Sequence, residues 1–408
     1  MSCRFCGYSD LDLIIDLGFQ PPSNSYLESS HQTSRQLFFP LRMLSCPSCN
    51  LVQAEDYADP EELFTHQYPY LSSTSSTWLK HAEKYCRMIV KKLGLNHDSF
   101  VIEVASNDGY LLKNFVKMNV PCLGIEPTKS TASVALGQGI KTVQEFFTEA
   151  LAKQLVEKNL QCDLIVGNNV YAHVPDINDF TSGIAAILKP EGVVTLEFPH
   201  FLNLIKKAQF DTIYHEHFSY LTLKVVSKIF AKHNLKIFDV EQLETHGGSL
   251  RIYGARSGSR WLEKPSVRQI LKFEEEADLF NFDTFKMFNL NVQKIKYDLL
   301  SFLIEQKRGG KRIVGYGAAA KGNTFINYAG IKSDLLSFVV DSAKSKQNKW
   351  LPGSNIPIFD PQILNITNVD FVWILPWNLA DEITDQLTYL KSKGIRFFTA
   401  IPSLELLN

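Results

Sequence analysis

The chain has 408 residues, enough for two or three domains with cores of their own. Its 42 Lys and Arg nearly balance 43 Asp and Glu, so no basic surplus supports a nucleic-acid partner. The polar start, MSCRFCGYSD, and the lack of a long apolar run predict neither a signal peptide nor a membrane partner, so we expect a cytoplasmic protein whose seven cysteines stay reduced.

Two C-x-x-C pairs stand near the front of the chain. Cys3 and Cys6 form the first, and Cys46 and Cys49 form the second, in CPSC, with a short strand expected at LVQ just after it. Two such pairs can place four thiolates around zinc in a closed structural site. The spacing is longer than in a compact zinc ribbon, and a redox pair or two unrelated surface pairs are the alternatives. The pattern favours structural zinc in an N-terminal domain, residues 1–64.

An α/β domain is predicted to follow, over residues 65–257. WLKHAEKYCRMIVKKLGL, residues 78–95, has the apolar spacing of an amphipathic helix. The apolar run over residues 100–104 then predicts a buried parallel strand, and a helix is expected to begin near Tyr110.

The turn after this strand, ASNDG, differs from the G-x-G-x-x-G of a dinucleotide site, because it holds one glycine among acidic and amide side chains. Such groups at a strand end suit a ligand that carries an ammonium and a carboxylate, and S-adenosylmethionine is one. The residues expected to bind it here are Glu103, Ala105, Ser106, Asn107, Asp108 and Gly109.

The next strands extend the same pattern. VPCLGIEP places Glu126 and Pro127 at a strand end, where the carboxylate can accept from both ribose hydroxyls. QCDLIVGNNVYAHVPD is predicted as a fourth strand that ends in Asn168 and Asn169, and ILKPEGVVTLEFPH as a helix end, a turn and a fifth strand. Sixth and seventh strands are expected at residues 235–243 and 249–257. This ordered set predicts a class I methyltransferase, a Rossmann-like fold.

A second Rossmann-like unit is expected at the end of the chain. Helices over residues 258–308 link it to the first, and residues 309–408 form it, with strands near 313–314, 371–375 and 396–399. Its turn, GYGAAAKG, is typical of a phosphate site at a helix N-terminus. We expect Gly317, Lys321 and Asn323 to contact the diphosphate of a substrate. Asp341 closes the following strand, either as a ribose ligand of a nicotinamide cofactor or as the start of a loop.

The stretch YHEHFSY, residues 214–220, gathers proton-handling side chains. In a strand, His215 and His217 would share one face and Glu216 the other. A metal pair would need a third ligand, which local spacing does not supply, and a polar loop is the other alternative. Its place after the fifth strand favours catalysis, because a returning chain could stand over the methyl donor.

These motifs together resemble the sugar C-methyltransferase family, whose best-known members methylate C-3 of nucleotide-linked 4-keto or 3-keto deoxysugars on antibiotic pathways. The resemblance covers nearly the whole chain. It is carried by the two C-x-x-C pairs, EVASNDGYLL at 103–112, YHEHFSY, HGGSLR at 246–251 and GYGAAAKGNT at 315–324. It implies an N-terminal zinc-binding domain, a central class I methyltransferase domain and a C-terminal Rossmann-like domain that binds substrate.

The resemblance also assigns functions to individual residues. It implies that His217 is the catalytic base, with Tyr214 and Glu216 beside it. His173 and one of Tyr68 and Tyr70 are expected to face the substrate. His246 and Arg251, from HGGSLR, complete the predicted substrate-binding residues.

The predicted reaction is S-adenosylmethionine-dependent methylation of a carbon next to a ketone. A neutral His217 can remove the acidic proton, with Glu216 or a backbone carbonyl fixing its tautomer, and Tyr214 can donate to the enolate oxygen. The carbanion then attacks the methyl group in line. The alternatives are an RNA or protein methyltransferase, a non-catalytic scaffold and a nicotinamide oxidoreductase. No local motif reports the nucleotide base, the methylated carbon, its stereochemistry or the oligomeric state.

Overall fold

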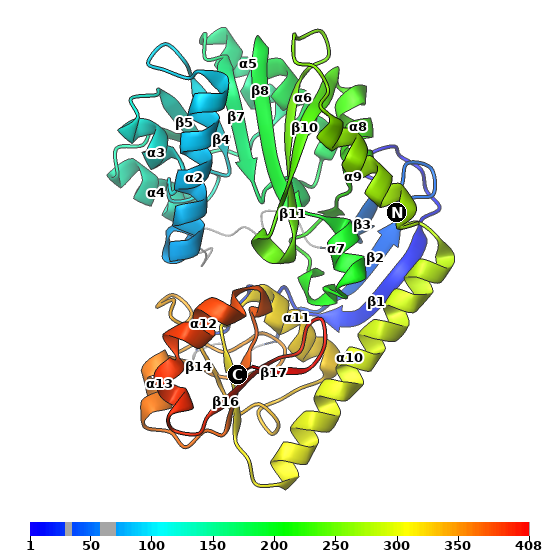
Figure 1. The fold of residues 1–408 in the computed structure, drawn as a ribbon, viewed down its shortest axis with the longest axis vertical. Coiled ribbons are helices and arrows are strands. Elements are labelled where there is room, and N and C mark those ends of the chain that lie inside the picture. The colour runs from blue at the N-terminus through cyan, green and yellow to red at the C-terminus, as the bar shows by residue number, and fades with distance from the viewer. Residues whose placement is uncertain (29–34, 58–70, 408) are drawn as a thin grey trace.

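The structure, a computed structural model, describes residues 1–28, 35–57 and 71–407. Within these ranges the strands form three sheets, of four, seven and six strands. Figure 1 shows the seven-stranded sheet in the upper half of the view, the six-stranded sheet below it, and the four-stranded sheet beside the junction between them. The predicted fold class, a class I methyltransferase core with a small N-terminal domain and a C-terminal α/β domain, is confirmed.

The seven-stranded sheet has the order β10-β11-β8-β7-β4-β5-β6. Neighbouring strands are parallel except at β11, which lies antiparallel between β8 and β10 because a short turn joins β10 to β11 as a hairpin. The strands are β4 (Val101–Val104), β5 (Cys122–Ile125), β6 (Thr142–Val143), β7 (Cys162–Asn168), β8 (Leu188–Pro199), β10 (Leu235–Leu243) and β11 (Ser249–Arg256).

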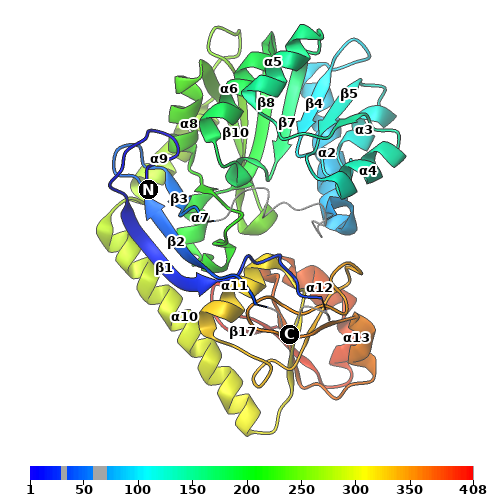
Figure 2. The ribbon, with the colours of Figure 1, turned by 180° about the vertical axis from the view of Figure 1, so that it is seen from behind.

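Helices cover both faces of this sheet, because side chains alternate along its central strands. Leu164 and Val166 of β7 pack with α2 and α3, whereas Ile165 packs with α5 and α6 on the other face. Figure 2 shows that second face from behind. The helices are α2 (Ser76–Leu93), α3 (Leu112–Lys117), α4 (Lys129–Gly137), α5 (Glu149–Glu157), α6 (Ile177–Ile187) and α8 (Leu223–Lys232).

Local sequence explains why α2 forms where it does. The Ser75 side chain accepts a hydrogen bond from the Trp78 amide and caps the start, and Gly94, with a φ of 69°, ends the helix in a left-handed conformation. Its buried side chains are Ala82, Tyr85, Cys86 and Ile89, which follow helical spacing.

The N-terminal sheet has the order β1-β2-β3-β9, with β1 (Asp12–Gln20), β2 (Phe39–Ser45), β3 (Val52–Ala54) and β9 (Ser219–Tyr220). Strand β3 confirms the expected strand after the second cysteine pair. Strand β9 is the end of YHEHFSY and pairs antiparallel with β3. The rest of that stretch is a turn closed by the His217 amide, which donates to the Tyr214 carbonyl at 2.9 Å, so its histidines do not alternate as in a strand.

The four predicted cysteine ligands come together beside this sheet. The Sγ atoms of Cys3 and Cys49 are 3.5 Å apart, as are those of Cys6 and Cys46, and all four lie within 4.8 Å of one another. Sulfurs on a tetrahedral zinc lie about 3.8 Å apart at the usual bond length. The spacing of the four sulfurs is therefore close to that of a tetrahedral zinc site.

The C-terminal sheet has the order β14-β13-β12-β15-β16-β17, parallel except for the antiparallel pair β16–β17. Because β12 lies between β13 and β15, the turn after β12 stands at a topological switch point, where open sheets bind ligands. The strands are β12 (Ile313–Tyr316), β13 (Val339–Val340), β14 (Ile358–Phe359), β15 (Phe371–Ile374), β16 (Arg396–Thr399) and β17 (Glu405–Leu407), with helices α11 (Ala320–Ala329), α12 (Ala380–Gln386) and α13 (Thr388–Lys391).

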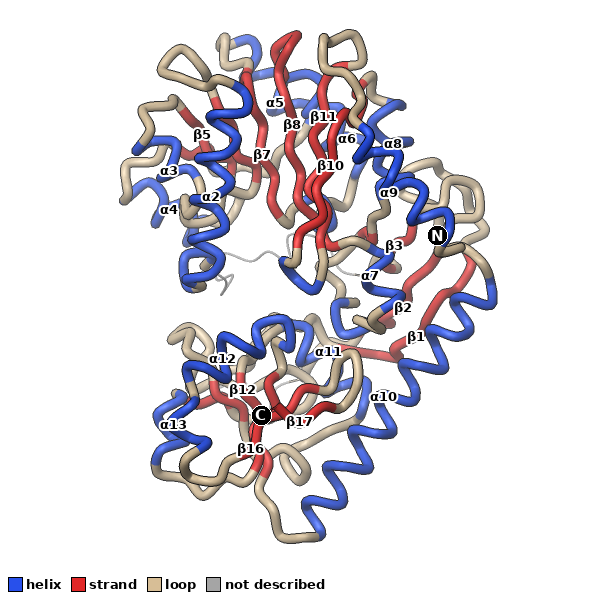
Figure 3. The backbone as a smooth tube through the Cα atoms, in the orientation of Figure 1, coloured by secondary structure: helices blue, strands red, loops and turns tan. Residues whose placement is uncertain are grey.

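The predicted linking helices are α9 (Pro265–Glu276) and α10 (Phe282–Arg308). They are separated at Asp278, which has a φ of 45°, and α10 begins where the Asn281 side chain accepts from the Asp283 amide. Figure 3 shows α10 running from the side of the N-terminal sheet to the far end of the C-terminal domain. Helix α7 (Phe201–Lys206) follows β8. No helix in the described ranges combines the length and apolar character that a membrane crossing requires.

The cysteine geometry yields a test. Cys46→Ser removes one thiolate, so we expect bound zinc to fall from about one ion per chain and the melting temperature to drop, because structural zinc contributes directly to folding. Cys122→Ser is the matched control, since that thiol lies at the start of β5, outside the cluster. Elemental analysis and thermal unfolding give the readout. A Cys46→Ser protein with full zinc and unchanged melting would contradict the assignment.

Candidate functional site

A cavity of about 790 Å³ lies among the three parts of the chain described above. Its wall includes the carboxyl ends of β4, β5 and β7, the turn before β9, and the start of α11. Eleven of the residues singled out in the sequence line it: Ala105, Asn107, Glu126, Pro127, Asn168, Asn169, His173, Tyr214, His217, His246 and Lys321.

The turn after β4 is tightly wound. Ala105, Asn107 and Gly109 have φ values of 55°, 51° and 78°, and a Cβ at Gly109 would lie 2.3 Å from the side chain of Ile140. Glu126 at the end of β5 accepts from the backbone amides of Asn107, at 3.0 Å, and Thr128, at 2.8 Å. One carboxylate therefore holds the β4 and β5 turns together at the cavity.

The other predicted residues of this turn lie behind the cavity wall. Asp108 accepts from the Ser73 amide at 3.1 Å and so ties the turn to the segment before α2. Burial raises the pKa of Glu103 well above its usual value, with the carboxylates of Asp108 and Glu126 adding to the effect. Glu103, Ser106, Asp108 and Gly109 are not among the lining residues.

Two asparagines at the end of β7 fit a polar ligand. Both amide atoms of Asn168 and the amide oxygen of Asn169 are buried and have no protein hydrogen-bond partner in the described part of the chain. A buried polar atom left without a partner costs about 1–3 kcal/mol. Because these atoms belong to cavity-lining residues, a bound ligand that supplies the missing hydrogen bonds would recover that cost.

The imidazole of His217 is held in one tautomer. Its Nδ1–H donates to the Thr212 carbonyl at 2.8 Å, so Nε2 carries the lone pair and accepts from the Tyr214 hydroxyl at 2.8 Å. The backbone carbonyl, one of the two predicted groups, therefore fixes the tautomer, and Glu216 does not.

Burial keeps this group of imidazoles uncharged. The rings of His173 and His217 meet edge-on with centroids 4.6 Å apart. Burial lowers the pKa of His217 well below its usual value, and the neighbouring His173 adds to the effect. Burial lowers the pKa of His173 to about 4 and that of His246 to about 4. The cavity thus presents neutral rings, which can accept protons.

The neighbours of His217 in the turn point elsewhere. Glu216 is buried outside the cavity lining, and its carboxylate accepts from the Asn24 side chain at 2.6 Å. His215 contacts the Pro40 carbonyl through Nε2 at 3.3 Å. Over the described residues, the one group of three or more potential metal ligands is the cysteine cluster, so the metal-pair alternative gains no support.

The C-terminal domain supplies the opposite wall through Ala319, Ala320, Lys321 and Lys346. Gly317 and Asn323 do not line the cavity. A Cβ at Gly317 would lie 2.6 Å from Pro376, and Asn323 is buried. The Asp341 carboxylate accepts from the Ala318 and Ala343 amides, both at 2.8 Å. It thereby closes the glycine-rich turn, which weighs against its use as a ribose ligand.

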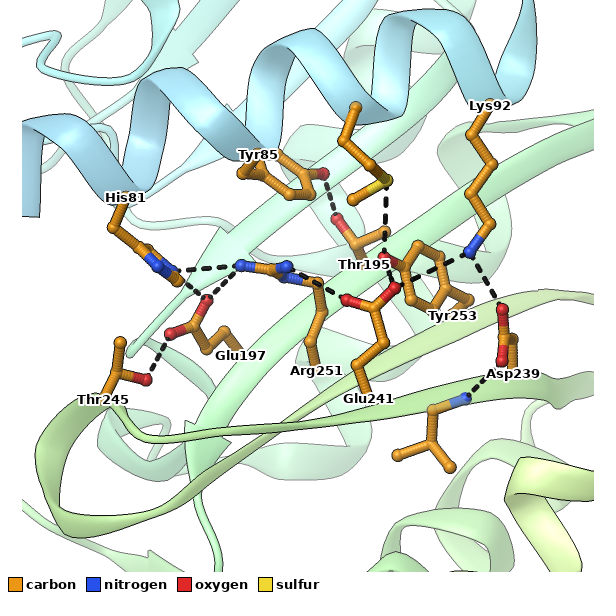
Figure 4. Close-up of polar contacts among 12 residues, drawn as sticks. His81, Tyr85, Lys92, Thr195, Glu197, Asp239, Glu241, Thr245, Arg251 and Tyr253 are labelled. Carbon is orange, nitrogen blue, oxygen red and sulfur yellow. Dashed lines mark hydrogen bonds and ion pairs between the residues drawn. The ribbon is translucent and has the colours of Figure 1, made fainter.

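Arg251 is a correction to the predicted substrate contacts. It does not line the cavity, and its guanidinium is bound to Glu197 at 2.9 Å and Glu241 at 3.2 Å (Figure 4). The pattern HGGSLR cannot reveal this, because both carboxylates lie on other strands of the sheet.

His246, in contrast, is held in the cavity wall by that same network. Glu197 accepts from the Thr245 hydroxyl at 2.8 Å and from the His81 ring at 2.9 Å, as Figure 4 shows. His246 itself has a φ of 53°, and its Nε2 accepts a hydrogen bond from the Asn169 side-chain amide at 2.9 Å. Sequence reasoning missed Glu197, His81 and Trp78, the last of which lines the cavity and stacks on His81. Tyr68 and Tyr70 lie outside the described residues.

Three stretches of the chain match known protein families. Residues 3–64 match a zinc binding domain, residues 78–240 a methyltransferase domain, and residues 244–402 a C-methyltransferase C-terminal domain. The chain is 30% identical over 400 residues to C-methyltransferase NovU of Streptomyces niveus, and the match covers 98% of this chain and 95% of NovU.

Solved methyltransferase structures are also similar over part of the chain. Magnesium protoporphyrin IX methyltransferase of Synechocystis with bound SAH is 14% identical, with a TM-score of 0.35 over 44% of this chain and 83% of that one. An S-adenosylmethionine-dependent methyltransferase of Anabaena variabilis is 12% identical, with a TM-score of 0.38 over 49% and 96%. The full-length match to NovU establishes the family.

The contacts of Glu126 generate a prediction. Glu126→Gln leaves one acceptor oxygen for two backbone amides and turns an NH₂ group toward a donor, so we expect the dissociation constant of S-adenosylmethionine to rise about 10- to 100-fold. Glu149→Gln is the matched control, because that half-exposed carboxylate pairs with Lys153 at the start of α5. Isothermal titration calorimetry measures both. Equal affinity in wild type and Glu126→Gln would refute a ribose-binding role.

Proposed function

The chain belongs to the C-methyltransferase family and uses S-adenosylmethionine, and we propose that its acceptor is a keto-deoxysugar linked to a nucleoside diphosphate. The observation that carries the proposal is the shared cavity, which joins the β4–β5–β7 strand ends, a neutral imidazole and the start of α11. We keep the division into residues 1–64, 65–257, 258–308 and 309–408 as the proposed domain organisation.

The methyl donor is assigned to the β4–β5–β7 end of the cavity. Glu126 would accept from its ribose hydroxyls, and the unpartnered amide of Asn168 would meet its polar amino-acid end. Phe146 and Phe147 line the same cavity and offer an apolar surface for the adenine. When bound, S-adenosylmethionine supplies an electrophilic methyl group on sulfur.

His217 is assigned as the base. Its Nδ1–H is committed to the Thr212 carbonyl, so Nε2 is the atom that can take the proton from the carbon next to the ketone. The Tyr214 hydroxyl occupies Nε2 when no sugar is bound, and the incoming sugar displaces it. Burial favours the neutral form that a base requires. His173 packs against the ring and limits its motion.

The nucleoside diphosphate is assigned to the start of α11. No side chain caps this helix, and Ala319 and Ala320, at its first positions, line the cavity. The Ala319 amide donates to the Gly317 carbonyl at 2.8 Å, but the amides of the first helical turn, from Ala320 on, have no partner within the helix. These amides and the positive end of the helix dipole attract anionic oxygens. A sugar whose diphosphate lies here would extend toward His217 across the cavity.

The direct test is to incubate the protein with S-adenosylmethionine and a panel of nucleoside-diphosphate keto-deoxysugars, and to look by mass spectrometry for a gain of one methylene unit. We expect gain with at least one keto-sugar and none with the matching alcohol, because only a ketone acidifies the adjacent C–H. Methylation of RNA or protein, with no sugar modified, would favour the alternative acceptors.

His217→Asn tests the base. We expect kcat to fall about 10²- to 10⁴-fold, the usual contribution of a general base, while S-adenosylmethionine binding is retained. His215→Asn is the matched control, because it removes an imidazole from the same turn that faces Pro40 instead of the cavity. His217→Asn turnover close to wild type, with His215→Asn also active, would remove His217 from this function.

The pH dependence follows from the same burial. Protonation disables the base, and because the pKa of His217 in the folded protein lies well below 6.5, we expect kcat/KM to stay level as the pH falls through 6.5 and to decline at lower pH. Initial rates over about pH 5–8, with incubated enzyme returned to neutral pH to exclude unfolding, give the profile. An acid limb centred at or above 6.5 would contradict a buried base.

A further inference from the structure

Lys321 is a partly buried cation in the cavity wall. It is the second residue of α11, and its Nζ donates to the neutral side chain of Asn378 at 2.6 Å. The ammonium also lies 4.7 Å from the centre of the Trp377 ring. Within the described ranges no carboxylate contacts the ammonium directly. Burial lowers its pKa, and the nearby charge of Asp211 offsets part of that effect. Because no carboxylate contacts this desolvated ammonium directly, an anionic oxygen of a ligand is a suitable partner for it.

Lys321 is linked to His217 through the contacts of Trp377 and through its electric field. The Trp377 indole donates to Asp211 at 2.7 Å, and Asp211 directly precedes Thr212, whose carbonyl holds His217. The positive charge of Lys321 lowers the pKa of both His217 and His246, so its field reaches the two imidazoles. The second lysine of the wall is engaged elsewhere, because Lys346 donates to the Ala318 carbonyl at 2.8 Å.

The hydrogen-bond donors around the cavity are unequally committed. The Asn169 side chain donates to His246, and the neutral Tyr214 hydroxyl donates to His217 until the sugar displaces it. An ammonium has three N–H donors, and Asn378 takes one of those of Lys321. Lys321 therefore retains both the charge and the donors that an anionic oxygen needs.

We propose that the Lys321 ammonium binds the substrate ketone oxygen and stabilises the enolate during methyl transfer. This rests on the proposed function, and it replaces the diphosphate contact expected for Lys321 from the sequence. His217 Nε2 takes the proton, the C–H electron pair forms the C=C bond, and the carbonyl π pair moves to the oxygen beside Lys321. The pair on the oxygen then re-forms the C=O bond, and the C=C π pair forms the C–C bond to the methyl group. The C–S bond breaks with its electrons on sulfur. The proton on His217 passes to solvent.

The variant Lys321→Gln tests this, because it keeps a donor and removes the charge. With a keto-sugar that wild type methylates, we expect kcat to fall about 10²- to 10³-fold, as when an oxyanion donor is lost, with little change in KM. Exchange of the C–H proton with deuterated solvent, with S-adenosylhomocysteine bound, should fall in parallel. Lys311→Gln, a half-exposed lysine paired with Asp370 in the same domain, should behave as wild type.

A diphosphate contact would give the opposite pattern. In Lys321→Gln, KM would rise and the binding of thymidine, uridine and guanosine diphosphates would weaken, while exchange of the C–H proton at saturating sugar would persist. That result, or no change at all, overturns the proposal. If Lys321→Gln does not fold, Lys321→Met replaces it, and the same two patterns decide between the enolate contact and the diphosphate contact. Failure of wild type to methylate any keto-sugar would instead sink the proposed function, so the two failures are distinguishable.

Discussion

The site depends on one hydrogen bond, from His217 Nδ1–H to the Thr212 carbonyl. It fixes the tautomer, and so decides that Nε2 is the atom with a lone pair facing the cavity. The segment that contains Thr212 and His217 is held at both ends. Asp211, the preceding residue, binds Trp377 of the C-terminal domain, and the chain after His217 enters the N-terminal sheet as β9. The geometry of one imidazole is therefore set by contacts that reach three domains.

Burial explains how neutral and charged groups coexist in this cavity. Desolvation disfavours any charge, so His173, His217 and His246 are held neutral. The same desolvation penalises the charge of a lysine, so stability alone does not explain a lysine at this position. The buried carboxylate of Glu197 is surrounded by three donors, whereas Lys321 has one hydrogen-bond acceptor, Asn378, and the nearby charge of Asp211. This difference in direct partners is the basis for the function proposed for Lys321.

The sequence predicts those features that local chemistry determines. Strand ends, the cysteine pairs and the ASNDG turn follow from residues close in the chain, and each appears where expected. The sequence does not predict contacts between distant segments. Arg251 has the character of a substrate ligand until Glu197 and Glu241 are placed beside it, and Glu216 has that of a catalytic group until Asn24 meets it. Local spacing cannot report partners that only folding brings together.

The N-terminal domain is better understood as part of the site than as a separate recognition module. Strand β3, which follows the second cysteine pair, pairs with β9 directly after His217, and Asn24 of the same domain binds Glu216. Loss of zinc would therefore loosen the turn that carries the proposed base, even though the metal lies outside the cavity. Under the proposed function, this coupling gives the zinc domain a part in positioning the base, in addition to its part in folding.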